Sequence, residues 1–196
     1  KSFISLKLLV LLESMDNILK QLPKKAKDKE NENKKLFKKL RKKPPKHLDK
    51  LMVELHDKEF EKTNCLQCAN CCKTTAPWLN DQDIARISKH LKLKDQKFIE
   101  QYLEVGEDHE FSFKLIPCVF LMPDNECSIY NVRPKACREY PHTNRRRFQQ
   151  IETVTIANTA ICPATYNIME ALKNALPVQY SENGGKPREK FRKGGG

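Results

Sequence analysis

The feature that most constrains this chain is a run of cysteines at residues 65–72, with the sequence CLQCANCC. Two cysteines in a C-x-x-C turn place their side chains on the same side, where both can reach one metal ion. Three cysteines at C-x-x-C-x-x-C spacing are typical of ligands to a [4Fe–4S] cluster, whose fourth cysteine comes from elsewhere and is often followed by proline. The run therefore predicts a metal centre that holds either an iron–sulfur cluster, with [4Fe–4S] preferred, or zinc.

Four further cysteines lie downstream of this run, and Cys162 is followed by the expected proline, Pro163. Because Cys72 directly follows Cys71, we expect its side chain to point away, to a second site or to a second face of the same site. Eight cysteines divide into two four-sulfur sites, or into one site with additional thiols, and the sequence leaves both arrangements open. The predicted metal ligands are Cys65, Cys68, Cys71, Cys72, Cys118, Cys127, Cys137 and Cys162.

Disulfide bonding is the less favoured interpretation of these cysteines. A short run with this spacing is a poor disulfide framework, and no secretion signal is recognisable near the start of the chain. His142 lies shortly after Cys137 and could serve as a ligand, but a surface histidine is the preferred interpretation. The predicted ligand set is therefore made of thiols alone.

Basic residues accompany the later cysteines in the sequence. Arg133 and Arg138 are candidates to lie beside the metal ligands, where their charge would help to keep thiols deprotonated. Ordinary salt bridging at the surface or at the edge of the core is an equally good interpretation of both arginines.

The net charge of the chain is concentrated toward its ends. Residues 20–50 hold fourteen Lys or Arg against four Asp or Glu, which is +10 of the total of +12. We expect a basic, disordered extension over residues 1–46, a nearly neutral metal-binding domain over residues 47–178 and a flexible basic, Gly-rich tail over residues 179–196. The basic run could bind nucleic acid or another polyanion, although a solvated run without a partner is the simpler interpretation.

The first residues of the chain include an apolar stretch at residues 3–12. This stretch is shorter than the about 20 residues that a membrane-spanning helix needs, and no small-residue cleavage site follows it. Met15 offers an alternative start for the native protein. We therefore expect a cytoplasmic protein without a transmembrane anchor.

Hydrophobic periodicity predicts an α+β fold, a small cysteine-rich domain in which helices accompany a short antiparallel hairpin or sheet. The only glycine between residues 47 and 180 is Gly106, so the glycine-rich loops of nucleotide-binding folds are missing from this domain. The predicted helices cover residues 47–62, 81–91, a segment that begins near Asp95, and 163–175. The predicted strands cover residues 111–116, 119–122, 127–130 and 151–156.

Two blocks of sequence resemble a known family. The first is the CxxCxxCC run itself, and the second is residues 117–141, which contain the pattern C-x-I-Y-x-x-R-P-x-x-C-R-x-Y-P. Together with the late Cys162-Pro163, they are similar to the YkgJ-type bacterial cysteine-cluster proteins, a zinc- or iron-chelating domain. The resemblance covers about residues 60–165 and implies metal chelation by the cysteines. It does not imply the activity of a longer relative, the flagellin lysine methylase, because this chain matches only the cysteine region.

Two functional hypotheses follow from the sequence. The first is a protein that holds an iron–sulfur cluster or zinc and acts in redox chemistry, metal handling or a modification reaction. The second is a zinc-stabilised interaction module that presents its basic arm to RNA, ribosomes or DNA. An iron–sulfur protein is brown and a zinc protein is colourless, so an absorption spectrum separates the two.

Overall fold

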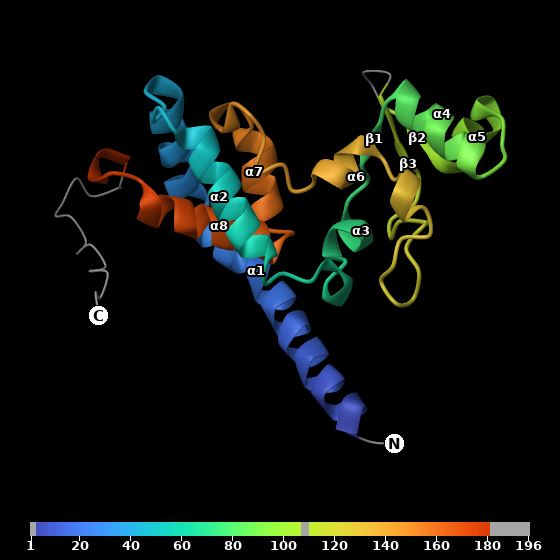
Figure 1. The fold of residues 1–196 in the computed structure, drawn as a ribbon, viewed down its shortest axis with the longest axis horizontal. Coiled ribbons are helices and arrows are strands. Elements are labelled where there is room, and N and C mark those ends of the chain that lie inside the picture. Colours follow the sequence, from blue (N-terminus) through green and yellow to red (C-terminus); the bar gives the residue numbers. More distant parts are fainter. Residues whose placement is uncertain (1–2, 107–109, 181–196) are drawn as a thin grey trace, which may run out of the picture.

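The computed structural model describes residues 3–106 and 110–180 (Figure 1). Its fold is α+β, as predicted: mostly helical, with one small antiparallel sheet. Most of the predicted tail over residues 179–196 lies outside the described residues. The helices are α1 (Phe3–Lys42), α2 (Leu48–Phe60), α3 (Asn70–Thr74), α4 (Asp81–His90), α5 (Asp95–Tyr102), α6 (Lys135–Glu139), α7 (Glu152–Thr159) and α8 (Pro163–Ala175). The strands are β1 (Trp78–Leu79), β2 (Leu103–Val105) and β3 (Phe111–Phe113).

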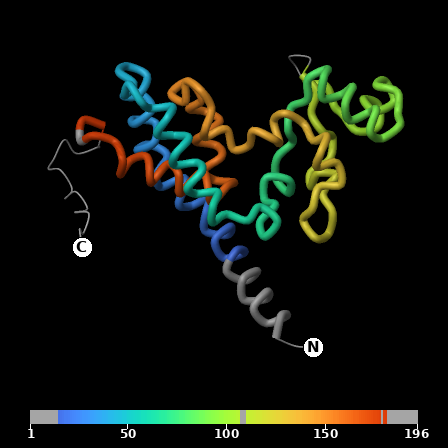
Figure 2. The backbone as a smooth tube through the Cα atoms, viewed as in Figure 1, coloured from blue at the N-terminus to red at the C-terminus, as the bar shows by residue number. Residues whose placement is uncertain are grey.

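These elements form two lobes, which Figures 1 and 2 show side by side. Helices α1, α2, α7 and α8 pack together as the helical lobe, and α4, α5 and the sheet pack as the sheet lobe. The chain crosses to the sheet lobe between α2 and β1, through α3. It returns between α6 and α7. The cysteine run lies on the outward crossing.

The helical lobe is built around apolar side chains that recur at helical spacing. Met52 of α2 and Phe37 of α1 are fully buried, and the ring of Phe37 lies 5.3 Å from that of Phe148 between centroids. The carboxylate of Asp49 on α2 accepts hydrogen bonds from the backbone N–H groups of Arg147 and Phe148 at 2.9 and 3.1 Å. The buried core of this lobe is Leu36, Phe37, Leu40, Leu48, Met52, Phe148, Ile168, Met169, Leu172, Leu176 and Tyr180.

The structure differs from the sequence-based expectation over residues 15–42, which are helical rather than disordered. Leu36, Phe37 and Leu40 from this segment belong to the core of the helical lobe, so the core crosses the predicted boundary at residue 46. The physical reason is that a few apolar residues at i, i+1 and i+4 spacing bury one face of the helix. The many lysines occupy the other face of the helix. Because they dominate the average composition of this segment, that average does not reveal the buried apolar stripe.

The sheet lobe is held by three short strands in the order β1-β3-β2, with both pairs antiparallel. Helix α4 begins with a capping box. The Asn80 side chain accepts a hydrogen bond from the backbone N–H of Asp83, and the Asp83 side chain accepts one from the backbone N–H of Asn80. Ile87, Phe98 and Phe113 are buried beneath the sheet and helices. This lobe therefore has a core of its own.

Several predicted helices are confirmed, and two predicted strand regions are wrong. Residues 152–156 belong to α7 and Ile151 is its N-cap, and Thr155 and Thr159 are buried on one face of this helix. Its β-branched residues suggested a strand, but packing against α1 and α8 selects a helix. The predicted hairpin over residues 119–130 is reduced to a single bridge between Leu121 and Cys127.

No helix within the described part of the chain combines the length and the apolar character that crossing a membrane requires.

The packing of α1 gives a direct stability prediction. Replacing Phe37 with Ala leaves a cavity at the centre of the helical lobe, and we expect the free energy of unfolding to fall by about 3–5 kcal/mol. The neighbouring exposed residue provides the matched control, because Lys38→Ala should change it by less than about 0.5 kcal/mol. Urea denaturation followed by circular dichroism measures the change for both variants. Equal changes in the free energy of unfolding would mean that α1 does not pack into the core of the helical lobe.

Candidate metal centre

The cysteine run is folded into two tight turns at the end of the outward crossing. The carbonyl of Cys65 accepts hydrogen bonds from the backbone N–H groups of Cys68 and Ala69, at 3.0 and 2.8 Å. Ala69 then adopts a left-handed conformation with φ of 47°, a position that favours glycine because of its Cβ atom. This reversal starts α3, which carries both Cys71 and Cys72.

Cys71 and Cys72 are adjacent on α3, so their side chains leave the helix about 100° apart. Their sulfur atoms still lie 3.9 Å from one another, and either sulfur can donate to the other. The two thiols are therefore adjacent to each other on α3, but their side chains point in different directions.

Cys162 is brought to the cysteine run by a long-range hydrogen bond. The side-chain amide of Asn70 donates to the backbone carbonyl of Ile161 at 2.7 Å. Because Cys162 follows Ile161 directly and is the N-cap of α8, this bond holds it beside the run. The thiols of Cys65, Cys68 and Cys71 each interact electrostatically with the thiol of Cys162. We call Cys65, Cys68, Cys71 and Cys162 the first thiol group.

The remaining cysteines gather around Cys72, whose thiol also interacts electrostatically with Cys65, Cys68 and Cys71. The backbone N–H of Cys118 donates to the carbonyl of Cys72 at 2.8 Å, and the bridge between Leu121 and Cys127 brings Cys127 back toward Cys118. The thiol of Cys137, on α6, interacts electrostatically with Cys72, Cys118 and Cys127. We call Cys72, Cys118, Cys127 and Cys137 the second thiol group.

All eight cysteines are free thiols in the structure; Cys65 is exposed and the other seven are partly buried. Burial is the largest cause that raises the pKa of most of them, and it raises the pKa of Cys137 to about 12. The contact between Cys71 and Cys72 raises the pKa of Cys71 and lowers that of Cys72. The other thiols whose pKa is raised by burial are Cys65, Cys68, Cys118 and Cys127.

The two arginines singled out in the sequence have different positions. The guanidinium of Arg133 lies 3.8 Å from the centre of the Tyr130 ring, and its positive charge acts to lower the pKa of Cys127 and Cys137. Arg138 donates to the backbone carbonyl of Arg133 at 2.7 Å. Arg133 is therefore placed to offset charge on the second thiol group, whereas Arg138 holds the backbone of that segment.

Lys73 supplies the corresponding positive charge at the first thiol group. Its ammonium donates to the backbone carbonyl of Cys68 at 3.1 Å, and it acts to lower the pKa of both Cys68 and Cys72. Its place at the end of α3 puts it next to both groups.

Tyr140 is a residue for which the sequence favours a packing role over donation to sulfur. Its hydroxyl is buried and has no hydrogen-bond partner among the residues that the structure describes. Burial is the largest cause that raises its pKa, followed by the thiols of Cys162 and Cys71. A buried phenol seldom lacks a partner, and the groups that act electrostatically on Tyr140 are thiols. The Tyr-Pro pair at the end of the second sequence block was the available signal.

Two other polar residues lie close to the site: Asp83, which the sequence did not indicate, and His142, which was expected at the surface and is partly buried. Asp83 is 2% exposed, and its carboxylate accepts from the backbone N–H of Lys135 at 3.0 Å and pairs with Arg86. This fixes the start of α6, and with it Cys137. His142 packs edge-on against Tyr140 with ring centroids 6.3 Å apart, and burial lowers its pKa.

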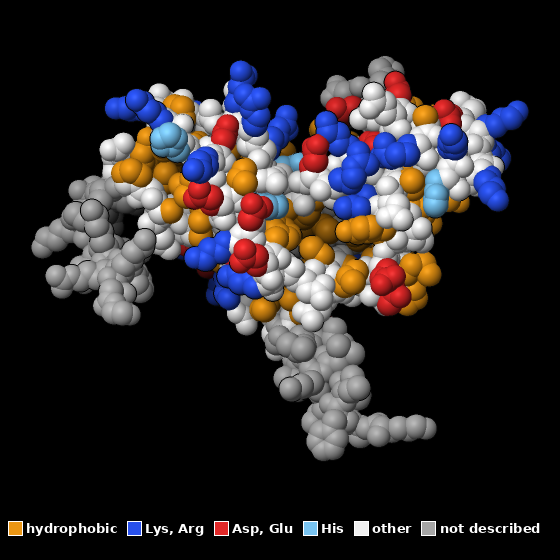
Figure 3. All heavy atoms as spheres, viewed as in Figure 1, with side chains coloured by type: hydrophobic (Ala, Val, Ile, Leu, Met, Phe, Trp, Pro, Cys, Tyr) orange, Lys and Arg blue, Asp and Glu red, His pale blue; other side chains and the backbone are white. Residues whose placement is uncertain are grey.

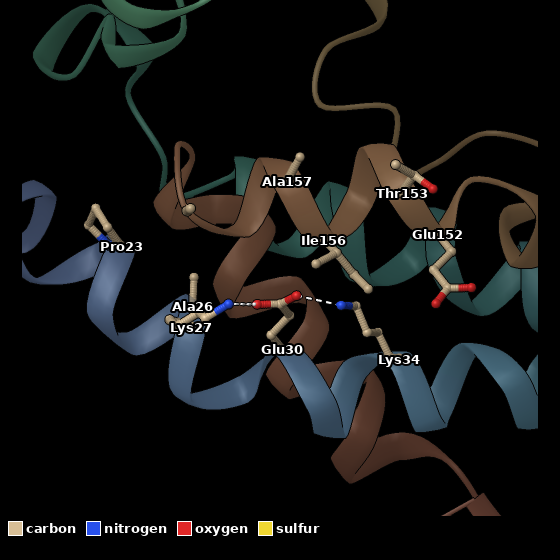
Figure 4. A pocket seen from close by; sticks show the side chains of 10 residues that line it. Pro23, Ala26, Lys27, Glu30, Lys34, Glu152, Thr153, Ile156 and Ala157 are labelled. Carbon is tan, nitrogen blue, oxygen red and sulfur yellow. Dashed lines mark hydrogen bonds and ion pairs between the residues drawn. The ribbon is translucent and has the colours of Figure 1, made fainter.

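One hollow of the surface adjoins the cysteine region. It has a volume of about 440 Å³, and Asp83, Lys135, Ala136 and His142 are among the residues that line it. Figure 4 shows another cavity, of about 400 Å³, between α1 and α7, where Glu30 pairs with Lys27 and Lys34. In Figure 3, apolar side chains, the class that includes cysteine, line the hollowed region between the two lobes. No cysteine lines either of these two cavities, so the thiols lie at a junction between segments.

The donor set fits a thiophilic metal centre. Soft thiolates select zinc and iron–sulfur clusters over hard cations such as Mg²⁺ and Ca²⁺. Across residues 3–106 and 110–180, no three Cys, His, Asp or Glu side chains already stand as a group that could hold a metal ion. Metal binding would therefore have to draw thiols from separate segments together.

An α+β domain whose central feature is eight free, clustered cysteines has the character of a thiolate metal-binding protein. Sequence comparison agrees: residues 64–162 match the model of the CxxCxxCC family, described as "Putative zinc- or iron-chelating domain". The chain belongs to this family, and the matched region contains all eight cysteines. No solved structure matches the chain.

The raised thiol pKa values lead to a prediction about pH. A thiol with a raised pKa is protonated at neutral pH and must lose that proton before it binds metal. The affinity of the reduced chain for Zn²⁺ should therefore rise with pH, by about 100-fold or more between pH 6.5 and 7.5 if two or more protons leave. Competition with a chromophoric chelator, corrected for the chelator's own protonation, measures this. A constant affinity would show that thiols are not the ligands.

Proposed function

We propose that this protein is an iron–sulfur protein that holds a [4Fe–4S] cluster through Cys65, Cys68, Cys71 and Cys162. The observation that carries the proposal is the hydrogen bond from Asn70 to the carbonyl of Ile161, at 2.7 Å. It places a Cys-Pro pair beside a C-x-x-C-x-x-C run, and that combination is typical of cubane ligation.

The surroundings of the first thiol group support this assignment. Such a cluster would supply one-electron transfer when bound. Lys73 lies against the Cys68 backbone and would offset the negative charge of the thiolates. Tyr140 presents an unpartnered hydroxyl that can donate to sulfur, a contact of the kind that tunes reduction potentials. Cys65 is exposed, which leaves one edge of the group open to an electron-transfer partner.

The same observations support a reducing compartment. Eight cysteines persist as free thiols although several lie close to one another. Such thiols are maintained in the cytosol and are oxidised in secretory compartments. We infer that the protein is cytoplasmic.

Colour and iron content test the proposal. The full chain purified without oxygen should be brown, with broad visible absorption and with iron and acid-labile sulfide in equal amounts. Cys68→Ser should lower the iron content about fivefold or more, since it removes one of the cluster ligands. Gln67→Ala is the matched control, because Gln67 is exposed in the same turn. A colourless wild-type protein that contains only zinc would overturn the assignment.

A second candidate function is a zinc-stabilised module that presents a basic surface to nucleic acid. The observation that favours it is the position of the lysines on α1. Lys24, Lys25, Lys38 and Lys42 are exposed, while the opposite face of the same helix is buried in the core. A rigid helix with one basic face can follow a phosphate backbone without reading bases.

Charge reversal separates this function from a role in solubility alone. Replacing Lys24, Lys25, Lys38 and Lys42 with Glu should weaken binding to duplex RNA or DNA about tenfold or more at low salt, and wild-type binding should fall steeply as salt rises. The control carries the same charge change on Lys58, Lys89, Lys94 and Lys97, which are also exposed. Gel-shift titration at two salt concentrations measures both. Equal loss in the two variants, or no wild-type shift, would reject the candidate.

A further inference from the structure

We infer that the eight cysteines form two separate metal sites, and that Cys72, Cys118, Cys127 and Cys137 are the ligands of a second one. This inference rests on the proposed function in that it takes the first thiol group to be a metal site. It goes further by giving the remaining four cysteines a site of their own. The argument follows the contacts that divide Cys71 from Cys72.

The division begins on α3. This helix has Asn70 at its start and Cys72 near its end, and each makes one long-range contact through a different segment. Asn70 binds the segment before Cys162, whereas the carbonyl of Cys72 accepts from Cys118. Carbonyls in the last turn of a helix lack partners within the helix, so the carbonyl of Cys72 can accept from the Cys118 segment. The two ends of α3 are therefore fastened to different segments, one that leads to Cys162 and one that begins at Cys118.

The second group is completed inside the sheet lobe. The backbone N–H of Leu121 donates to the carbonyl of Cys118 at 3.0 Å, and Ser128 donates to Phe120 at 2.9 Å. With the Leu121–Cys127 bridge, these bonds fold residues 118–128 into a loop that brings Cys118 and Cys127 to one end. The packing of Phe120 and Ile129 in the core of the sheet lobe anchors this loop.

Cys137 reaches the same place from α6. The start of α6 is fixed to α4 through Asp83, whose carboxylate accepts from Lys135. The guanidinium of Arg86 on the same helix donates to the backbone carbonyl of Arg133 at 2.9 Å. Three segments, α3, the loop over residues 118–128 and α6, thus converge with their thiols on one region.

The two groups also differ in exposure and in positive charge. The first contains the exposed Cys65 and has Lys73 beside it, and Lys73 also acts on Cys72 of the second. The second contains partly buried thiols and has Arg133 beside Cys127 and Cys137. A closed set of four thiols from three segments suits one tetrahedral ion with a structural role, and Zn²⁺ is the ion that such sites commonly take. We therefore assign the second site to Zn²⁺.

Partial metal removal followed by thiol labelling tests the two-site arrangement on the wild-type chain. The full chain, loaded with Zn²⁺ alone, should hold two equivalents. A chelator in limiting amount should then expose cysteines to alkylation in two groups of four, with Cys72 labelled together with Cys118, Cys127 and Cys137. Fragmentation mass spectrometry distinguishes Cys71 from Cys72. Labelling of all eight together, or of Cys72 together with Cys71, would overturn the inference.

Variants give a second and independent readout. Cys127→Ser should remove one of the two equivalents of Zn²⁺ and leave the other, and Cys68→Ser should remove the complementary one. Retention of one equivalent in Cys127→Ser would also show that this variant folds. A wild-type chain that binds two Zn²⁺ but never assembles iron and sulfide would reject the [4Fe–4S] proposal and still support the two-site inference. A wild-type chain that binds one equivalent of Zn²⁺ would reject the two-site inference. A wild-type chain that binds no metal would reject both the two-site inference and the [4Fe–4S] proposal.

Discussion

Two hydrogen bonds at the ends of α3 determine what the cysteines can face. One runs from the Asn70 side chain to the carbonyl of Ile161, across 91 residues of sequence. The other runs from the Cys118 backbone to the carbonyl of Cys72. A helix of five residues has almost no stability of its own in water, so these contacts hold α3 between the lobes. They fix the cysteine run relative to Cys162 and to Cys118, while the Leu121–Cys127 bridge and Asp83 place Cys127 and Cys137.

The buried thiols are costly to deprotonate without a metal. Burial raises the pKa of most of them, so each enters the folded state protonated and must release its proton to bind. The sheet lobe offers little to offset this cost, because its strands hold two or three residues each. Metal binding is then part of the folding free energy of the junction. The helical lobe, with its large core around Phe37 and Met52, is expected to depend on it much less.

The sequence was informative where local pattern decides structure. The helices over residues 81–91 and 163–175 follow from Asn80 as a cap, Pro163 at the first turn and apolar residues at helical spacing. The identity of the cysteine family followed from the two sequence blocks. In α7 the same kind of pattern misled, since β-branched residues favour strands until packing against α1 and α8 is included.

The division of the thiols lay beyond the sequence, because it depends on which distant segment each end of α3 contacts. Nothing local to Asn70 indicates that its amide will bind Ile161, and nothing near Cys118 indicates Cys72 as its partner. The buried stripe of α1 was likewise concealed by the lysines between Leu22 and Leu40. Polar positions such as Asp83, which orients α6 without touching a thiol, carry no signal in a single sequence.

The adjacency of Cys71 and Cys72 has a consequence for how two occupied sites would behave. Each four-thiolate site would carry a net charge of about −2, and the two sites would share a boundary where the sulfurs are now 3.9 Å apart. Filling one site raises the electrostatic cost of filling the other, unless positive charge lies between them. Lys73 acts on both Cys68 and Cys72, and Arg133 acts on Cys127 and Cys137. The cations are therefore distributed as two neighbouring sites require, with Lys73 at the boundary and Arg133 on the far side of the second.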